Sequence, residues 1–163
     1  MNKPGQYDAD KLKGEAEFYR LAIAMALISI DEVVVWADEV ITILDEPPIQ
    51  IIDIALAGSK PKFDMMILLA AVPGQGDLTH SAHRALGLLS TQFQLDQVTI
   101  DEAAEKLEAY YACAHVPHEE SYKALAFFDV VNCYNLGYYG TFESITHESI
   151  KAEIQSFLDD YAV

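Results

Sequence analysis

Positive charge is scarce in this sequence. The 163 residues include 10 Lys and Arg against 26 Asp and Glu, which gives a formal net charge of −16. A molecule of this sign repels the phosphate backbone of nucleic acids and anionic lipid headgroups. We therefore expect neither nucleic acid nor membrane as a partner. A basic protein partner, a cationic ligand, a divalent metal and solubility alone are all compatible with the charge.

Cysteine is scarce as well. Cys113 and Cys133 are too few for a disulfide framework, and their apolar, helical surroundings suit buried thiols in a reducing compartment. The first twenty residues lack the apolar run of a signal peptide, and the run at residues 21–30 is too short to span a bilayer. These features predict a soluble, cytoplasmic protein.

The period-two alternation of a half-buried strand is nowhere sustained, whereas apolar residues recur at intervals of three and four. This pattern predicts an all-α fold, a single compact bundle of seven to eight helices with short connections, in one domain over residues 1–163. Ser29 with Glu32 and Thr99 with Glu102 are capping-box patterns that mark two helix starts. The predicted helices cover about 8–28, 30–44, 49–56, 61–72, 77–93, 99–115, 117 to between 135 and 140, and 146–161.

Motifs of the common enzyme classes are missing too. No Gly-x-Ser-x-Gly or His-Glu-x-x-His occurs, and the turn around Gly74 and Gly76 lacks the Lys-Ser or Lys-Thr of a phosphate loop. Because nucleophile and base pairs leave no local signature, an enzyme stays open as an alternative, although the sequence favours a protein without catalytic activity. No catalytic residue and no cofactor are predicted.

Histidines are spaced three apart at two places, His80 with His83 and His115 with His118. Residues at this helical spacing can share a metal, but zinc sites usually need three or four ligands. Pro117 interrupts the second pair, so its side chains need not converge. We therefore predict no metal site.

What the sequence does have is a repeated acidic pair. Asp31-Glu32, Asp38-Glu39 and Asp45-Glu46 follow each other at seven residues, and no Lys or Arg lies between Arg20 and Lys60. Seven residues are nearly two helical turns, so the pairs would share one side of a helix. The helix dipole explains the first pair, but it disfavours the last pair, which lies near the predicted C-terminus of the helix.

A β-branched apolar residue, Val35, would stand within this acidic arc. Apolar anchors surrounded by polar groups are typical of recognition surfaces. A solvated helix face without a partner is the alternative interpretation. The predicted partner-binding residues are Val35, Asp38, Glu39, Thr42, Asp45 and Glu46.

One stretch resembles a known group of proteins. The segments Trp36-Ala-Asp38, Leu44-Asp-Glu-Pro-Pro48 and Ile51-Ile-Asp53 are similar to segments of small, acidic, mostly helical bacterial proteins, including immunity proteins encoded beside toxins. The resemblance covers about twenty residues. It implies a non-enzymatic cytoplasmic protein whose acidic face covers a basic toxin surface. No functional residue of that group can be placed on this sequence.

Two further functions are compatible with the sequence. The C-terminal half is rich in aromatic residues, and a small-ligand or catalytic pocket could form there with His115 or His118 nearby and residues 135–140 as its mouth. The other alternative is a homo-oligomeric structural protein.

Overall fold

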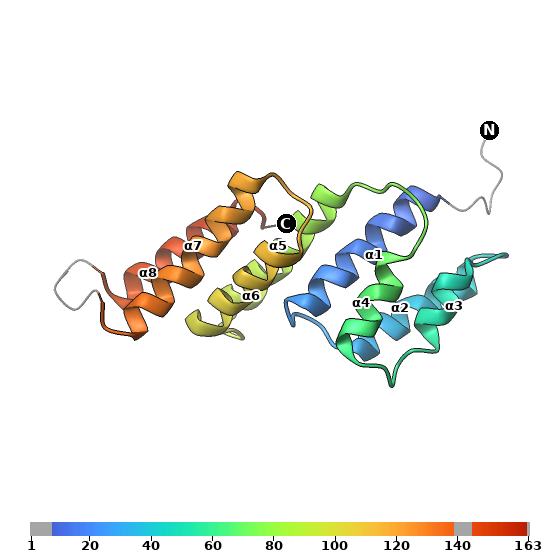
Figure 1. Cartoon of the computed structure of the whole chain (residues 1–163), viewed down its shortest axis with the longest axis horizontal. Coiled ribbons are helices and arrows are strands. Elements are labelled where there is room, and N and C mark those ends of the chain that lie inside the picture. Colours follow the sequence, from blue (N-terminus) through green and yellow to red (C-terminus); the bar gives the residue numbers. More distant parts are fainter. Residues whose placement is uncertain (1–7, 139–144, 163) are drawn as a thin grey trace. The chain divides into compact units, whose positions relative to one another are not determined.

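The computed structural model describes residues 8–138 and 145–162 of the chain, which form eight α-helices and no strand (Figure 1). The helices are α1 (Ala9–Ala24), α2 (Ile30–Ile43), α3 (Ile49–Ala55), α4 (Lys62–Ala70), α5 (Leu78–Gln94), α6 (Ile100–Cys113), α7 (His118–Asn135) and α8 (His147–Asp159). The predicted all-α bundle of seven to eight helices with short connections is confirmed.

The contacts within the chain divide it into two compact units, residues 1–81 and 82–163. Unit 1 contains α1 to α4 and the first turn of α5. Unit 2 contains the rest of α5 and α6 to α8. That all 163 residues form one domain stays a prediction.

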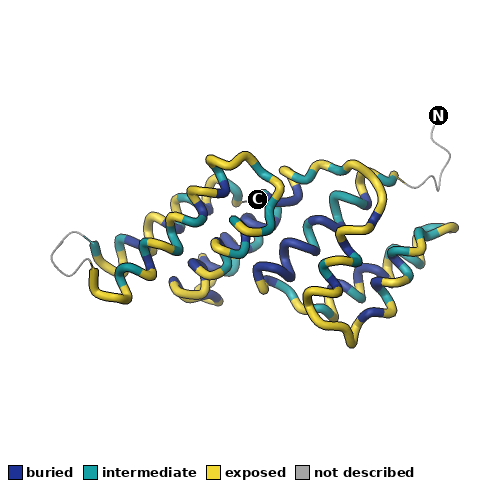
Figure 2. The backbone as a smooth tube through the Cα atoms, in the orientation of Figure 1, coloured by how far each residue is buried: buried dark blue, intermediate teal, exposed yellow. Residues whose placement is uncertain are grey.

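Unit 1 is built around α1, which packs against α4, while α2 packs against α3. Figure 2 shows α1 buried along much of its length. The Lys13 side chain fixes the α1–α4 pair, because its Nζ donates a hydrogen bond to the carbonyl oxygen of Ala70 at 2.6 Å. Burial lowers the pKa of Lys13 there. The core of the unit consists of Leu12, Ala16, Ile23, Val33, Trp36, Ala37, Ile51, Ile54, Ala57, Met65, Leu69 and Val72.

Both predicted capping boxes are present. The backbone N–H of Ser29 donates to Glu32 Oε2 at 2.7 Å, and that of Thr99 donates to Glu102 Oε2 at 2.8 Å. The hydrogen bonds from the Thr99 backbone and side chain lower the pKa of Glu102. These side chains pair donors that every helix N-terminus leaves without an intrahelical acceptor. They fix the first residues of α2 and α6.

The end of α1 differs from the prediction. The helix stops at Ala24 rather than near Ile28, because Ala26 takes a left-handed conformation with φ 51°. The N–H of Leu27 then donates to the carbonyl of Ala22 at 2.8 Å, which is the Schellman pattern of helix termination. Since Gly is the usual residue at this position and Ala occupies it here, the sequence carries no stop signal.

In unit 2, α6 packs along α7, and α8 lies against α7. Neither Cys113 nor Cys133 forms a disulfide within the described residues, and both are half-buried rather than fully buried as predicted. The buried hydrophobic residues of the unit are Ala82, Ala85, Leu86, Leu89, Phe93, Val98, Ile100, Ala103, Ala104, Leu107, Tyr110, Ala124, Val131, Ile150, Ile154 and Leu158.

Candidate functional site

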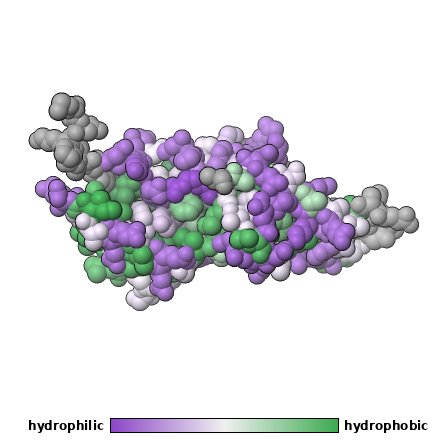
Figure 3. All heavy atoms as spheres, turned by 180° about the vertical axis from the view of Figure 1, so that it is seen from behind, coloured by the Kyte–Doolittle hydropathy of each residue, from purple (hydrophilic) through white to green (hydrophobic). Residues whose placement is uncertain are grey.

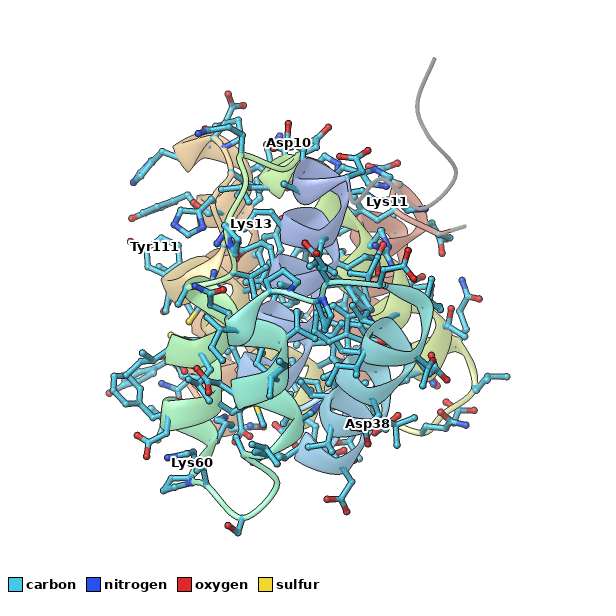
Figure 4. The ribbon with its side chains drawn as sticks, turned by 90° about the vertical axis from the view of Figure 1, so that its right-hand side faces the viewer. Asp10, Lys11, Lys13, Asp38, Lys60 and Tyr111 are labelled. Carbon is cyan, nitrogen blue, oxygen red and sulfur yellow. The ribbon has the colours of Figure 1, made fainter. Side chains whose placement is uncertain are left out.

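The outer face of α2 is acidic and exposed, as the sequence indicated. Asp31, Asp38 and Glu39 are all exposed on this helix, and Figure 4 labels Asp38 on it. Val35 stands among them with 56% of its surface exposed. Glu32 is exposed on this helix too. The outside of α2 therefore carries four carboxylates and one apolar side chain.

The third acidic pair does not belong to this helical face. The helix ends at Ile43, and Leu44 has an extended backbone with φ −95° and ψ 131°. Asp45 and Glu46 consequently lie in the connection before Pro47, so projecting the seven-residue spacing onto a continuous helix places them wrongly. Thr42 is exposed, but its hydroxyl donates to the backbone carbonyl of Glu39 at 2.7 Å.

A hollow of about 390 Å³ opens between α1 and α2, and we call it the acidic hollow. Its lining combines three carboxylates of α2 with aromatic and aliphatic side chains from both helices and their connection. The lining residues are Phe18, Tyr19, Ile28, Asp31, Glu32, Val35, Trp36 and Glu39. Two of the six predicted site residues, Val35 and Glu39, are among them.

The aromatic part of this lining joins the two helices. Tyr19 of α1 stacks on Trp36 of α2 with ring centroids 4.7 Å apart and an interplanar angle of 27°. Phe18 meets Tyr19 edge to face at 5.3 Å. Such offset-stacked and edge-to-face pairs are the favourable arrangements of aromatic rings. The rings form one wall of the acidic hollow, beside the carboxylates.

The carboxylates of the acidic hollow differ in what already binds them. Glu32 uses Oε2 for the capping box with Ser29. The side chains of Asp31 and Glu39 have no hydrogen-bond or ion-pair partner within residues 8–138 and 145–162. Their charge is therefore not neutralised by the described part of the chain, and a cation entering the hollow would be attracted to it.

A second hollow of about 230 Å³ lies on the same pair of helices, and we call it the apolar hollow. Trp36 lines both hollows. Ile43, at the rim, is 75% exposed. In Figure 3 the surface of unit 1 seen from behind carries hydrophobic areas beside hydrophilic ones. The lining residues are Asp8, Lys11, Leu12, Glu15, Trp36, Val40, Ile43 and Leu44, of which Lys11 is labelled in Figure 4.

Sequence reasoning missed part of this site. It did not include Phe18 or Trp36 among the site residues, and it explained Asp31-Glu32 by the helix dipole. Trp36 is buried, with 7% exposure, yet it still lines both hollows. Tyr19 carries no signal, because only the packing of α1 against α2 brings it to Trp36. The one usable signal was the position of Val35 beside acidic residues.

Unit 2 contains a partly buried polar network that the sequence did not indicate. Glu120 accepts a hydrogen bond from the Tyr110 hydroxyl at 2.7 Å, and its two oxygens lie 3.0 and 3.1 Å from His83 Nε2. Tyr161 lies beside the His83 ring at 4.9 Å between centroids. Burial first, and then Glu120, raises the pKa of both Tyr110 and Tyr161. The network ties α5, α6 and α7 to the C-terminal segment.

The predicted histidine positions do not form one site. Asp77 caps α5 by accepting the N–H of His80 at 2.8 Å, and His118 stacks on Tyr122 at 5.4 Å. An open hollow of about 450 Å³ follows one face of α7 and includes His118 and Tyr122, whereas His115 does not line it. Of the predicted pocket mouth at residues 135–140, the last two residues lie outside the described chain.

Together, the fold and the α1–α2 site define an all-α protein with an acidic helix face and two hollows that share one tryptophan. No family model matches the chain, and the comparisons with curated proteins and with solved structures found no match either. Among the described helices, none combines the length and apolarity needed to cross a bilayer. The described residues also contain no cluster of three or more His, Cys, Asp or Glu arranged to hold a metal ion.

Proposed function

We propose that this protein binds a basic protein partner through the outer face of α2 and the acidic hollow. The observation that carries the proposal is the pair of unpartnered carboxylates, Asp31 and Glu39, beside the Tyr19–Trp36 wall. Complementary charge speeds encounter and suppresses wrong partners, and a desolvated aromatic residue is a common centre of binding energy.

The kind of partner follows from the charge and from the resemblance of residues 36–53. A net charge of −16 attracts a strongly basic surface. Immunity-type inhibitors cover such a surface on a toxin, and we propose this role for the chain. Asp38 would contribute to the field of the face, and Asp45 and Glu46 would extend it beyond the end of α2.

The experiment uses two variants with the same charge change. The first carries Asp38→Lys and Glu39→Lys on α2, and the matched control carries Glu108→Lys and Glu153→Lys on α6 and α8, where both side chains are exposed. A partner captured from the source cell by cross-linking to the wild-type chain is purified, and its binding to each protein is measured by calorimetry at low and at physiological salt.

We expect the α2 variant to bind at least about tenfold more weakly than wild type, and the control to lose less than about threefold through the general field. Affinity should also fall as salt rises. Equal losses in both variants would show that only the net charge matters. An unchanged affinity of the α2 variant would refute the proposed surface.

The alternatives from the sequence have less support in the structure. In the aromatic C-terminal half, a small ligand could bind in the hollow on α7. All the residues that line this hollow belong to that one helix, namely His118, Glu119, Tyr122, Lys123 and Ala126. A small-ligand or catalytic function, and a homo-oligomeric structural role, stay predictions.

A further inference from the structure

We propose that the acidic hollow binds an arginine side chain of the partner, while the apolar hollow binds an apolar side chain of the same partner segment. This inference rests on the proposed function, because it names the side chains by which a basic partner is recognised. It predicts that the contact segment of the partner contains one arginine and one apolar side chain, and that both contact Trp36.

Arginine fits the acidic hollow better than lysine does. A guanidinium is planar, stacks on aromatic faces and donates paired hydrogen bonds to carboxylates, whereas an ammonium is a compact and strongly hydrated charge. The hollow offers both features, since Trp36 and Tyr19 supply stacked rings and Asp31 and Glu39 supply carboxylates. Trp36 is only 7% exposed, so the half-buried rings of Phe18 and Tyr19 supply most of the aromatic surface that a guanidinium can reach.

The apolar hollow supplies the second contact. Leu12, Val40 and Leu44 line it together with Trp36, and the exposed Ile43 extends its rim. An apolar anchor in a pocket next to a desolvated charge contact is the usual anatomy of a strong interface centre. The charged residues in this lining are Asp8, Lys11 and Glu15, and their formal charges nearly cancel. The preference for a basic segment therefore comes from the acidic hollow, and the apolar hollow contributes the apolar contact.

A second copy of this chain is a poor occupant for the same surface. Each copy carries a net charge of −16, and the acidic face of α2 would meet a surface of like sign. Like charges brought together cost free energy and slow association. Charge complementarity therefore selects a basic partner.

Trp36 provides a direct test, because it is the single tryptophan of the chain and lines both hollows. The probe is a peptide that repeats the triplet arginine, leucine and alanine, so that several spacings of the two anchors are present. One matched peptide replaces arginine by citrulline, which keeps the shape and removes the charge. Another replaces leucine by alanine.

The first peptide should change the fluorescence of Trp36, and each matched peptide should bind at least about tenfold more weakly. A lysine version should bind more weakly than the arginine version. Equal binding of the citrulline peptide, or no response of Trp36 to the first peptide at millimolar concentration, would overturn the inference.

Two variant pairs separate this inference from the proposed function. Glu39→Gln and Asp38→Asn remove the same charge from neighbouring residues of α2, but only Glu39 lines the hollow. We expect E39Q to weaken binding of the first peptide about fivefold and D38N less than about twofold. Likewise, Ile43→Ser should weaken it, whereas Leu56→Ser, at a side chain that is 79% exposed and outside both hollows, should not.

The results for these variants distinguish a failure of the arginine site from a failure of the proposed function. If E39Q and D38N weaken binding equally, the face acts through its general field, and the proposed function survives while the arginine site does not. If the α2 charge reversal leaves the natural partner's affinity unchanged, the proposed function fails as well. Circular dichroism of each variant shows that a loss of binding is not a loss of fold, which is expected because all four substituted side chains are exposed.

Discussion

Tyr110 is the residue whose chemistry is most altered by the fold. Its side chain is fully buried, and its hydroxyl donates to Glu120 Oε1 at 2.7 Å. Burial first, and then the hydrogen bond and charge of Glu120, raise its pKa well above the ordinary 10.0. Because the folded pKa exceeds the unfolded one, the stability from Tyr110 is complete below about pH 10 and is lost as pH rises toward the folded pKa.

The variant Tyr110→Phe tests this linkage. At about pH 8 we expect its free energy of unfolding to be about 1–2 kcal/mol lower than that of wild type, because Glu120 loses a donor. Between about pH 9 and about pH 12 the wild type should lose more stability than the variant, since phenylalanine has no proton to release. Urea unfolding followed by circular dichroism at each pH measures both effects.

Tyr122→Phe is the matched control, because Tyr122 is 55% exposed. Its pH profile should follow that of wild type. If Tyr110→Phe also follows the wild-type profile above pH 10, another group causes the alkaline loss of stability.

At the scale of the helix, three C-termini share one form. α1, α5 and α7 are each followed by a residue with positive φ, namely Ala26 at 51°, Asp96 at 52° and Gly137 at 78°. In each case the next N–H donates back to a carbonyl five residues earlier. Only α7 uses Gly, the residue for which this conformation costs least.

The substitution Ala26→Gly should therefore raise the free energy of unfolding, by up to about 1 kcal/mol, because relief of the left-handed strain outweighs the added freedom of the unfolded chain. The mirror experiment is Gly137→Ala, which should lower it by about 1 kcal/mol. A Cβ at position 137 meets no atom within 4 Å, so that change isolates the backbone effect. Urea midpoints measure both, and a loss of stability in Ala26→Gly would contradict the assignment of strain.

Helix termini also show why sequence reasoning succeeded at some points and failed at others. The starts of α2 and α6 were predictable because Ser29 and Thr99 act locally with residues three positions later. The stop at Ala26 was not, since Ala has no special turn preference. The third acidic pair was misplaced for a related reason: a spacing of seven holds only while the helix lasts, and α2 ends at Ile43.

The candidate site was predictable only where it depends on local helix periodicity. Val35 and Glu39 follow from the periodicity of one helix. Tyr19 lies on α1 and Trp36 lies on α2. Their contact therefore depends on the tertiary packing of the two helices. Both hollows are lined by residues of α1 and of α2, and no local sequence pattern encodes such a space.

At the scale of the whole molecule, charge connects stability with the proposed binding. Acidic residues outnumber basic ones in both units, and the sequence pI is about 4.4. The field that attracts a basic partner also makes the folded chain repel itself. Salt should therefore act in opposite directions, weakening partner binding while stabilising the free protein.

Thermal unfolding at neutral pH tests the second half of this statement. Raising NaCl from about 0.01 M to about 0.15 M shortens the Debye length from about 30 Å to about 8 Å, so repulsion among the surface carboxylates is screened. We expect the Tm of the free protein to rise by about 2–4 °C, equivalent to about 1 kcal/mol for a chain of this size. Near the pI of about 4.4 the net charge vanishes, and the same addition of salt should leave Tm nearly constant. A Tm that rises equally at both pH values would mean that salt acts on hydrophobic burial instead. A Tm that falls at neutral pH would mean that favourable ion pairs outweigh the repulsion, such as the pair of Lys151 and Asp96 at 2.7 Å.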